Sequence, residues 1–241
     1  MDEQRQETKR RLEITWLGHG TFILNSPEGK RILIDPWLES NPVCPAEWKR
    51  IRKADLILIT HGHSDHIEDL LQTARDTEAS IVAMPELCHW LKGKGFRRVL
   101  PMNKGGSLVF GNIQINMVRA EHSSGWIEDG KMVYMGEPSG YVLRFEDGLT
   151  VYFAGDTSVF GDMRLIREMY GPEIGFLPIG DRFTMGPEGA AIACELLGIR
   201  QVVPMHYGTF PTLTGTPTRL RELIEPKGIV VLELKPGETA R

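Results

Sequence analysis

A buried strand that ends in a cluster of histidines constrains the fold of this chain more than any other feature. Residues Asp55–Thr60 (DLILIT) form a nearly continuous apolar run, the pattern of a strand buried on both faces. The run leads directly into the sequence HGHSDH at positions 61–66, and Ile67–Arg75 then predicts a helix. In α/β sheets, functional groups usually follow the carboxyl ends of strands. The pattern therefore predicts an α/β fold with a polar site at this strand end.

The rest of the chain also alternates between predicted strands and predicted helices. Glu146-Asp147-Gly148, between two predicted strands, is a hairpin signal. Further strands are predicted at Leu12–Leu17, Thr21–Leu24, Arg31–Ile34, Ser80–Met84, Val99, Leu108–Phe110, Ile113–Val118, Tyr141–Phe145, Thr150–Ala154, Ile174–Pro178, Gln201–Pro204 and Ile229–Leu234. Helices are predicted at Glu86–Lys92, Met163–Tyr170, Glu188–Leu197 and Thr218–Ile224. Interleaved strands and helices without a polar linker indicate one layered α/β domain over residues 1–241. Residues 1–11 are expected to form a flexible, charged tail.

The composition excludes several classes of protein. The net charge is -4, from 28 Lys+Arg against 32 Asp+Glu, so there is no electrostatic reason to expect a nucleic-acid partner. Met1–Arg11 contains no apolar signal region, and no apolar run approaches the ~20 residues that span a bilayer. We therefore expect a cytoplasmic protein without membrane insertion. The three cysteines share no CxxC spacing, which predicts free thiols that are buried or half-buried.

The HGHSDH sequence has the composition of a metal site. Four potential ligands lie within six residues, so His61 and His63 can bind one ion while Asp65 and His66 reach another. Neutral imidazole and carboxylate groups suit zinc and other first-row divalent ions. The alternative is a polar loop without a metal, but three crowded histidines at a strand end have little structural use there.

Three later residues follow predicted strands in the same manner. They are His122 in RAEHSSG, Asp156 in YFAGDTS and His206 in VPMHYGT. Each alone could be an incidental loop residue. Their joint occurrence after HGHSDH predicts that all three belong to the same metal site.

These ligands and their flanking segments resemble the metallo-β-lactamase superfamily. The segments are WLGHGTFIL at 16–24, IDPWLESNP at 34–42, EHSSG at 121–125, EPSGYVL at 137–143, FAGDT at 153–157, LPIGDRFTMGPEGA at 177–190 and PMHYGTFP at 204–211. They are similar to a group of bacterial and archaeal metal-dependent hydrolases related to L-ascorbate-6-phosphate lactonase and, more distantly, to N-acyl-phosphatidylethanolamine phospholipase D. The resemblance covers nearly the whole chain after about Leu12.

The resemblance implies an αββα sandwich with two metals at one edge of the sheets. It assigns His61, His63 and His122 to one metal, and Asp65, His66 and His206 to the other, with Asp156 as the bridge. Relatives often form homo-oligomers. The Asp181-Arg182 pair departs from the small or amide residues that relatives often carry there, which leaves the substrate open.

The resemblance implies a hydrolase of a small-molecule ester, lactone or phosphodiester. Two divalent ions per chain, with zinc favoured and manganese or iron also suitable, can share a water and lower its pKa towards ~7. Asp65 could accept a hydrogen bond from the nucleophile and later pass a proton to the leaving group.

Four further residues are candidates for supporting the site or binding substrate. Asp35 could orient a ligand imidazole, although an ordinary turn residue is an equal alternative. His19 could lie beside the site or have a purely structural role. Arg182 and Tyr207 could bind an anionic group or stabilise an oxyanion, against the simpler interpretations of a surface arginine and a packed tyrosine.

Other functions on the same fold stay open. A flavodiiron oxidoreductase normally has an acidic residue in place of His63 and needs a flavin domain. A sulfur dioxygenase could use a subset of these ligands around one iron. A superfamily nuclease usually carries an extra domain or basic surface. A non-enzymatic metal-binding or scaffold protein would be favoured by a missing ligand, and all seven are present.

Overall fold

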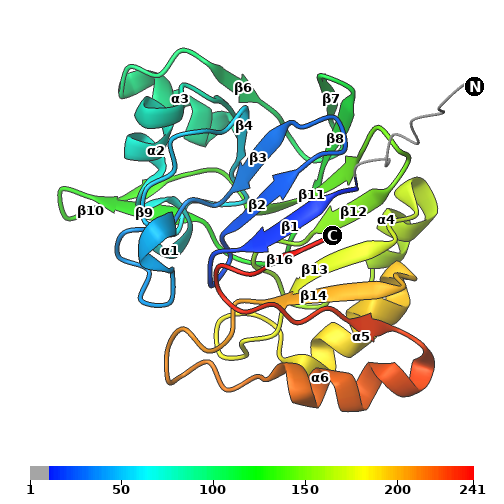
Figure 1. Cartoon of the computed structure of the whole chain (residues 1–241). Helices are drawn as coiled ribbons and strands as arrows, with labels where there is room; N and C mark the ends of the chain where they lie inside the picture. The colour runs from blue at the N-terminus through cyan, green and yellow to red at the C-terminus, as the bar shows by residue number, and fades with distance from the viewer. Residues whose placement is uncertain (1–10) are drawn as a thin grey trace, which may run out of the picture.

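Two stacked β-sheets form the centre of the structure, a computed structural model that describes residues 11–241 (Figure 1). Each sheet has seven strands, and helices cover the outer face of each sheet. This four-layer αββα arrangement confirms the predicted fold class. The predicted tail, residues 1–11, lies outside the described residues except for Arg11.

The first sheet has the strand order β16-β1-β2-β3-β4-β5-β6. Its strands are β1 (Glu13–Trp16), β2 (Phe22–Asn25), β3 (Arg31–Ile34), β4 (Leu56–Leu58), β5 (Ser80–Ala83), β6 (Val99–Pro101) and β16 (Thr239–Ala240). The associated helices are α1 (Ser64–Ile67), α2 (Leu70–Thr77) and α3 (Pro85–Gly93), with a 3-10 turn at Ala46–Trp48.

The second sheet has the strand order β15-β14-β13-β12-β11-β8-β7. Its strands are β7 (Ser107–Phe110), β8 (Ile113–Arg119), β11 (Ser139–Arg144), β12 (Thr150–Phe153), β13 (Ile174–Pro178), β14 (Gln201–Met205) and β15 (Val230–Val231). Its helices are α4 (Met163–Tyr170), α5 (Pro187–Leu197) and α6 (Pro217–Ile224), with a 3-10 turn at Glu225–Lys227. A separate two-stranded ribbon consists of β9 (Gly125–Glu128) and β10 (Lys131–Tyr134).

Alternation along the strands explains why the first sheet is covered on both faces. In β3, Ile32 and Ile34 pack in the core between the sheets, whereas Leu33 packs in the core beneath α2 and α3. Successive side chains of a strand point to opposite faces, so an apolar run such as RILI supplies both cores at once.

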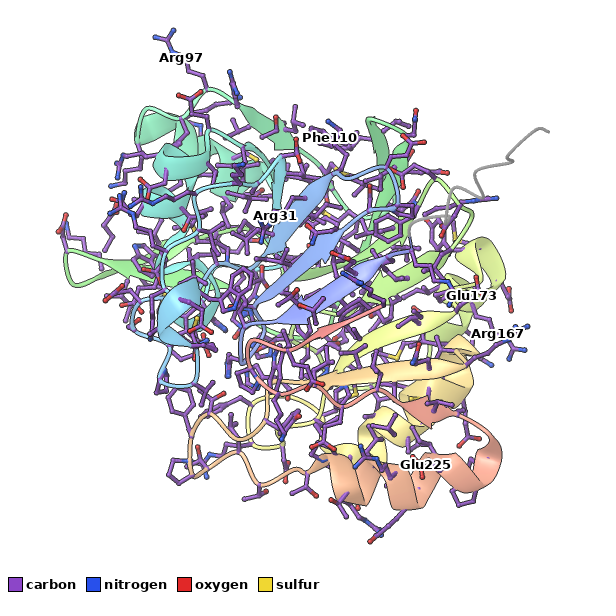
Figure 2. All side chains as sticks on the ribbon, in the orientation of Figure 1. Arg31, Arg97, Phe110, Arg167, Glu173 and Glu225 are labelled. Carbon is purple, nitrogen blue, oxygen red and sulfur yellow. The ribbon has the colours of Figure 1, made fainter. Side chains whose placement is uncertain are left out.

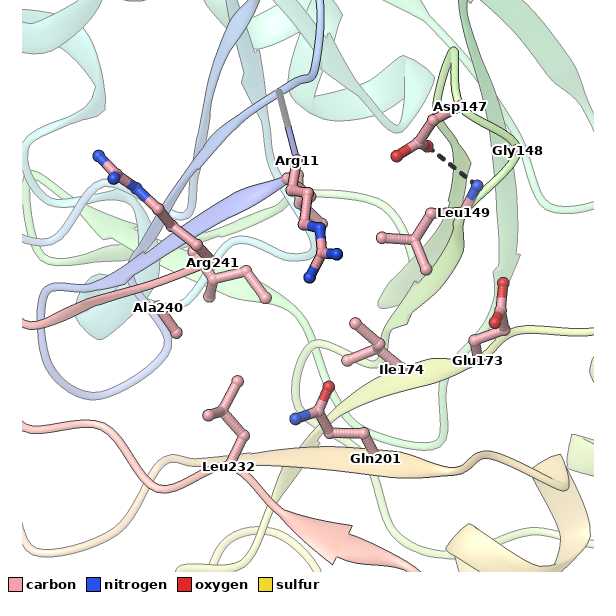
Figure 3. Close-up of a pocket in the computed structure, with 12 residues that line it drawn as sticks. Arg11, Asp147, Gly148, Leu149, Glu173, Ile174, Gln201, Leu232, Ala240 and Arg241 are labelled. Atoms are coloured by element: carbon pink, nitrogen blue, oxygen red, sulfur yellow. Dashed lines mark hydrogen bonds between the residues drawn. The ribbon is translucent and has the colours of Figure 1, made fainter. Parts of the chain in front are cut away.

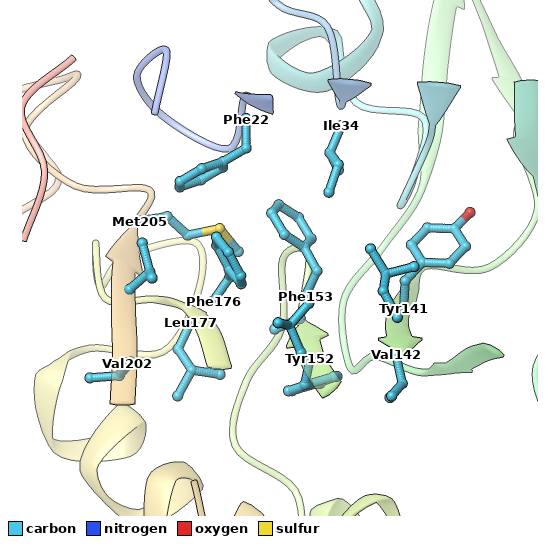
Figure 4. Packing of buried hydrophobic residues seen from close by; sticks show 14 of the residues in the cluster. Phe22, Ile34, Tyr141, Val142, Tyr152, Phe153, Phe176, Leu177, Val202 and Met205 are labelled. Atoms are coloured by element: carbon cyan, nitrogen blue, oxygen red, sulfur yellow. The ribbon is translucent and has the colours of Figure 1, made fainter. Parts of the chain in front are cut away.

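Aromatic rings interlock between the sheets. The ring of Phe22 on β2 lies 5.6 Å from that of Phe153 on β12 and 5.1 Å from that of Phe176 on β13 (Figure 4). All three side chains are fully buried. Edge-to-face contacts of this kind add to the free energy gained from burial, and they hold the two sheets at a fixed separation beneath the loops that follow the strands.

The carboxyl ends of the central strands meet at one edge of the sandwich. Strands β3 to β6 are parallel to one another, as are β12 to β15. At the opposite end, where β13 and β14 begin, a cavity of about 560 Å³ is lined by Ile174, Gln201, Leu149 and other residues (Figure 3). Its lining contains no histidine or cysteine among the described residues, so the metal-ligand candidates lie elsewhere.

The observed elements differ from the predicted ones in the short C-terminal strand β16, which was not predicted, and in three further places. The predicted helix Ile67–Arg75 is divided into α1 and α2, and α1 already begins at Ser64 inside the histidine loop. The predicted strand Ile229–Leu234 is reduced to Val230–Val231. The ribbon of β9 and β10 was not predicted, although its Asp129-Gly130 turn is a hairpin signal.

Charged side chains lie on the surface, and the cysteines are buried. Charged side chains such as Arg97, Arg167 and Glu225 are exposed on the outside of the molecule (Figure 2). All three cysteines, Cys44, Cys88 and Cys194, are buried and unpaired, as predicted. Within residues 11–241, no helix has the length and apolar character required to cross a bilayer.

Candidate metal centre

The seven predicted ligands converge at the carboxyl edge of the two sheets. They come from the segment after β4, which includes α1, and from the loops after β8, β12 and β14. The carboxylate of Asp156 is central. Its Oδ2 lies 3.0 Å from His206 Nε2, 3.4 Å from His66 Nε2, 3.6 Å from His122 Nε2 and 3.9 Å from His61 Nε2.

Besides a set made of Asp35, His61 and His66, the possible donor atoms near Asp156 form two groups. One group is His61, His63 and His122, whose ligand atoms lie within 4.8 Å of one another. The other group consists of His19, Asp65, His66 and His206. His63, Asp65 and His122 are only half-buried, whereas His61, His66 and His206 are buried. The site is thus open to solvent on one side and enclosed by protein on the other.

Several buried polar atoms in this cluster have no hydrogen-bond partner. They are His66 Nε2, Asp156 Oδ1, and both ring nitrogens of His206. The short distances to Asp156 lack hydrogen-bond geometry. Buried polar atoms without partners are costly. Imidazole nitrogens and carboxylate oxygens that converge in this way have the composition and placement of ligands for first-row divalent ions, so these residues fit a metal.

Asp35 supports the predicted ligand His66 from the side away from Asp156. Its Oδ2 accepts a hydrogen bond from His66 Nδ1 at 2.8 Å, and Oδ1 accepts one from the backbone N–H of Thr60, also at 2.8 Å. The Thr60 hydroxyl donates to Oδ2 at 2.5 Å. Asp35 and His66 are both completely buried. This arrangement holds the His66 ring with Nε2 directed at Asp156.

His19 contacts the other acidic residue among the predicted ligands, Asp65. His19 Nε2 lies 3.1 Å from Asp65 Oδ2, and His19 Nδ1 lies 3.0 Å from the hydroxyl of Thr209. Burial, together with the neighbouring His206, lowers the pKa of His19 to about 4. The sequence did not point to Thr60 or Thr209, because a threonine next to a ligand histidine is not in itself a signal.

Burial and neighbouring opposite charges shift the pKa values of the cluster in opposite directions. Burial lowers the pKa of His61 well below its ordinary value. Burial also acts to lower the pKa of His66, but Asp156 and Asp35 outweigh it and raise that pKa. Burial acts to raise the pKa of Asp156, but the neighbouring His206 and His66 outweigh burial, so the pKa is lowered well below its ordinary value. Asp156 is therefore held as a carboxylate, the form that binds a cation.

Arg182, on the loop after β13, and Tyr207, directly after His206, make other contacts. The Arg182 guanidinium lies over the ring of Phe183 at 5.8 Å on an exposed loop. The Tyr207 ring stacks on Trp16 at 5.1 Å. By contrast, Ser123, which was not singled out, places its hydroxyl 3.3 Å from His63 Nε2.

Gly20 makes room for a ligand ring. A Cβ at this position would lie 2.6 Å from His66 Cε1. Replacing Gly20 with alanine is therefore expected to displace the His66 ring, lowering stability by about 1–3 kcal/mol and weakening metal binding roughly tenfold. Thermal unfolding and competition with a chelator would measure the two effects.

Gly93→Ala provides the matched control, because no heavy atom lies within 4 Å of a Cβ built there. This variant should bind metal as the wild type does. Wild-type metal affinity in Gly20→Ala would contradict the close packing of His66.

The relationship to known proteins agrees with this geometry. Residues 30–207 match the family model described as "Beta-lactamase superfamily domain". A UPF0173 metal-dependent hydrolase of Solibacter usitatus is 49% identical, over 94% of this chain and 98% of that protein. The chain belongs to the UPF0173 metal-dependent hydrolases of the β-lactamase superfamily. The UPF0173 protein of Rubrobacter xylanophilus is 48% identical, over 97% of this chain and 98% of that protein.

A solved structure supports the same family assignment. Igni18, a metallo hydrolase from Ignicoccus hospitalis, is 37% identical and superimposes with a TM-score of 0.84, covering 95% of this chain and 97% of that one. The chain is thus an enzyme, a metal-dependent hydrolase of the UPF0173 family with the metallo-β-lactamase fold. This confirms the predicted superfamily and enzyme class.

Proposed function

We propose that this UPF0173 hydrolase works with two divalent ions, zinc in the first place, with manganese or iron also suitable. The observation that carries the proposal is the position of Asp156 between two groups of imidazoles. One ion would be held by His61, His63 and His122, the other by Asp65, His66 and His206, with Asp156 shared between them.

The substrate we propose is a small ester, lactone or phosphodiester, as the resemblance of the sequence motifs to a lactonase suggests. When bound, the two ions would generate a nucleophile from water near neutral pH and polarise the electrophilic centre. The half-buried Asp65 lies at the open side of the site, where its carboxylate can accept a proton and deliver it to a leaving group. The Ser123 hydroxyl lies beside His63 and is exposed, so it can donate a hydrogen bond to bound substrate.

Three of the four supporting residues have assigned roles in this proposal. Asp35 keeps the His66 ring in a single orientation, so that its Nε2 faces the shared carboxylate. Arg182 is exposed on the loop after β13, where it can meet an anionic substrate group, and Tyr207 has a packing role against Trp16. The proposal extends to a cytoplasmic homo-oligomer of single-domain subunits, whose assembly gel filtration would measure.

The first test is the metal content of the protein purified without added metal. We expect about two zinc or manganese ions per chain by elemental analysis, and the loss of at least one in His63→Ala, because that variant lacks one of three imidazoles in its group. Screening of lactones, esters and phosphodiesters would follow. A single iron per chain, or metal that is unchanged in His63→Ala, would contradict the two-ion site and redirect the search to oxidation.

A further inference from the structure

We propose that His19 is a positioning residue, which acts with Thr209 to hold the Asp65 carboxylate in the orientation that binds the second ion. The inference rests on the two-ion function proposed above and assigns to His19 a task that is distinct from direct ligation.

The contact between His19 and Asp65 is a directed hydrogen bond. Because a carboxylate can only accept, His19 Nε2 donates to Asp65 Oδ2, at 3.1 Å. Among the described residues, no hydrogen bond reaches Asp65 Oδ1. One oxygen of Asp65 is thus fixed by His19, and the carboxylate as a whole offers a ligand atom within 4.8 Å of ring nitrogens of His66 and His206.

Thr209 fixes the ring that makes this bond. Its hydroxyl lies 3.0 Å from His19 Nδ1, and both residues are buried. Since both ring nitrogens of His19 have partners, a flip of this fully buried ring would break two hydrogen bonds. Thr209 follows His206 by three residues, so the same loop carries one ligand and the residue that orients His19.

Packing around His19 supports a fixed position. Its ring centroid lies 3.8 Å from that of His206 and 5.1 Å from that of Trp37. Its backbone carbonyl accepts hydrogen bonds from Trp16 Nε1 and from the backbone N–H of His206. The loop is therefore attached to the neighbouring strand and to the ligand loop, which is the arrangement expected of a support rather than of a mobile catalytic group.

Two variants test the inference by their metal affinity, which does not require a substrate. His19→Asn keeps a side chain that tolerates the left-handed backbone at this position but cannot reach Asp65. Thr209→Val keeps His19 and removes the hydroxyl. We expect His19→Asn to lower the affinity for one of the two ions by 10–100-fold, and Thr209→Val to lower the affinity for the same ion by about tenfold. Competition between a chelator and the protein for zinc measures both affinities.

A double-mutant cycle with Asp65→Ala separates positioning from ligation. If His19 acts through Asp65, adding His19→Asn to Asp65→Ala causes no further loss of affinity. A further loss would make His19 a direct ligand and overturn the inference. The control is His89→Asn, a change at an exposed histidine on α3, which should leave both affinities unchanged.

The remaining outcomes are also decisive. Wild-type affinity for both ions in His19→Asn and Thr209→Val would overturn the inference and leave the two-ion function intact. Wild-type protein that binds no ion, or one only, would overturn the proposed function and the inference together. Thermal unfolding of the metal-free variants would show whether a variant has a folding defect. If His19→Asn does not fold, Thr209→Val still tests the inference.

Discussion

Replacing Asp156 with alanine is expected to remove metal-dependent hydrolysis, lowering kcat/KM by about 10³-fold or more, which corresponds to roughly 4 kcal/mol. Asp156 is the carboxylate that approaches imidazoles of both groups, with Oδ2 at 3.0 Å from His206 Nε2 and 3.6 Å from His122 Nε2. Its loss removes a ligand from each proposed ion, so both sites are weakened by one substitution. No other predicted ligand has this double effect.

The measurement combines kcat/KM on the best substrate from the screen with elemental analysis of the variant. Asp162→Ala, a change at an exposed aspartate that precedes α4, is the control and should retain activity and metal. Two bound ions in Asp156→Ala, with activity within tenfold of wild type, would show that Asp156 does not bridge the ions.

Removal of metal is expected to lower the Tm by roughly 8–16 °C. A ligand present at about 1,000 times its Kd stabilises the folded state by ~4.1 kcal/mol. Each kcal/mol shifts the Tm of a chain of this size by roughly 2–4 °C. The ligands come from loops of both sheets, so a bound ion connects the two halves of the sandwich, and its binding energy contributes to their association.

Thermal unfolding with and without EDTA measures this shift, and added zinc or manganese should reverse it. The Asp156→Ala variant is the matched control, since its Tm should respond little to EDTA. Equal Tm values for wild-type protein before and after chelation would mean that the ions do not support the fold.

The ligand cluster was accessible from the sequence because of strand geometry. His61, Asp156 and His206 each follow a buried strand, and carboxyl ends of parallel strands meet at one edge of a sheet. A buried strand can be found in the sequence as an apolar run, and the residues directly after the run are then expected at the carboxyl edge of the sheet. The convergence of seven donors could thus be predicted without knowing any loop conformation.

The supporting contacts could not be predicted in this way. Thr209 reaches His19 across 190 positions of sequence, and the direction of a single hydroxyl depends on loop backbone angles that no periodic pattern encodes. The orientation of the Arg182 side chain could not be predicted for the same reason, because Arg182 lies on a loop with two consecutive left-handed residues. The ribbon of β9 and β10 is different, because the Asp129-Gly130 turn between Ile127 and Met132 is a readable hairpin signal.

Three residues of the metal centre have backbone angles that their side chains disfavour. His19, Asp35 and His206 have φ values of 55°, 47° and 58°, in the left-handed region. Each costs about 1–2 kcal/mol relative to a regular conformation, and glycine would relieve this at all three positions. A selection for heat resistance alone would therefore favour glycine there and remove the chemistry. We expect stabilised versions of this enzyme to gain their stability from the two cores and to leave these three positions untouched.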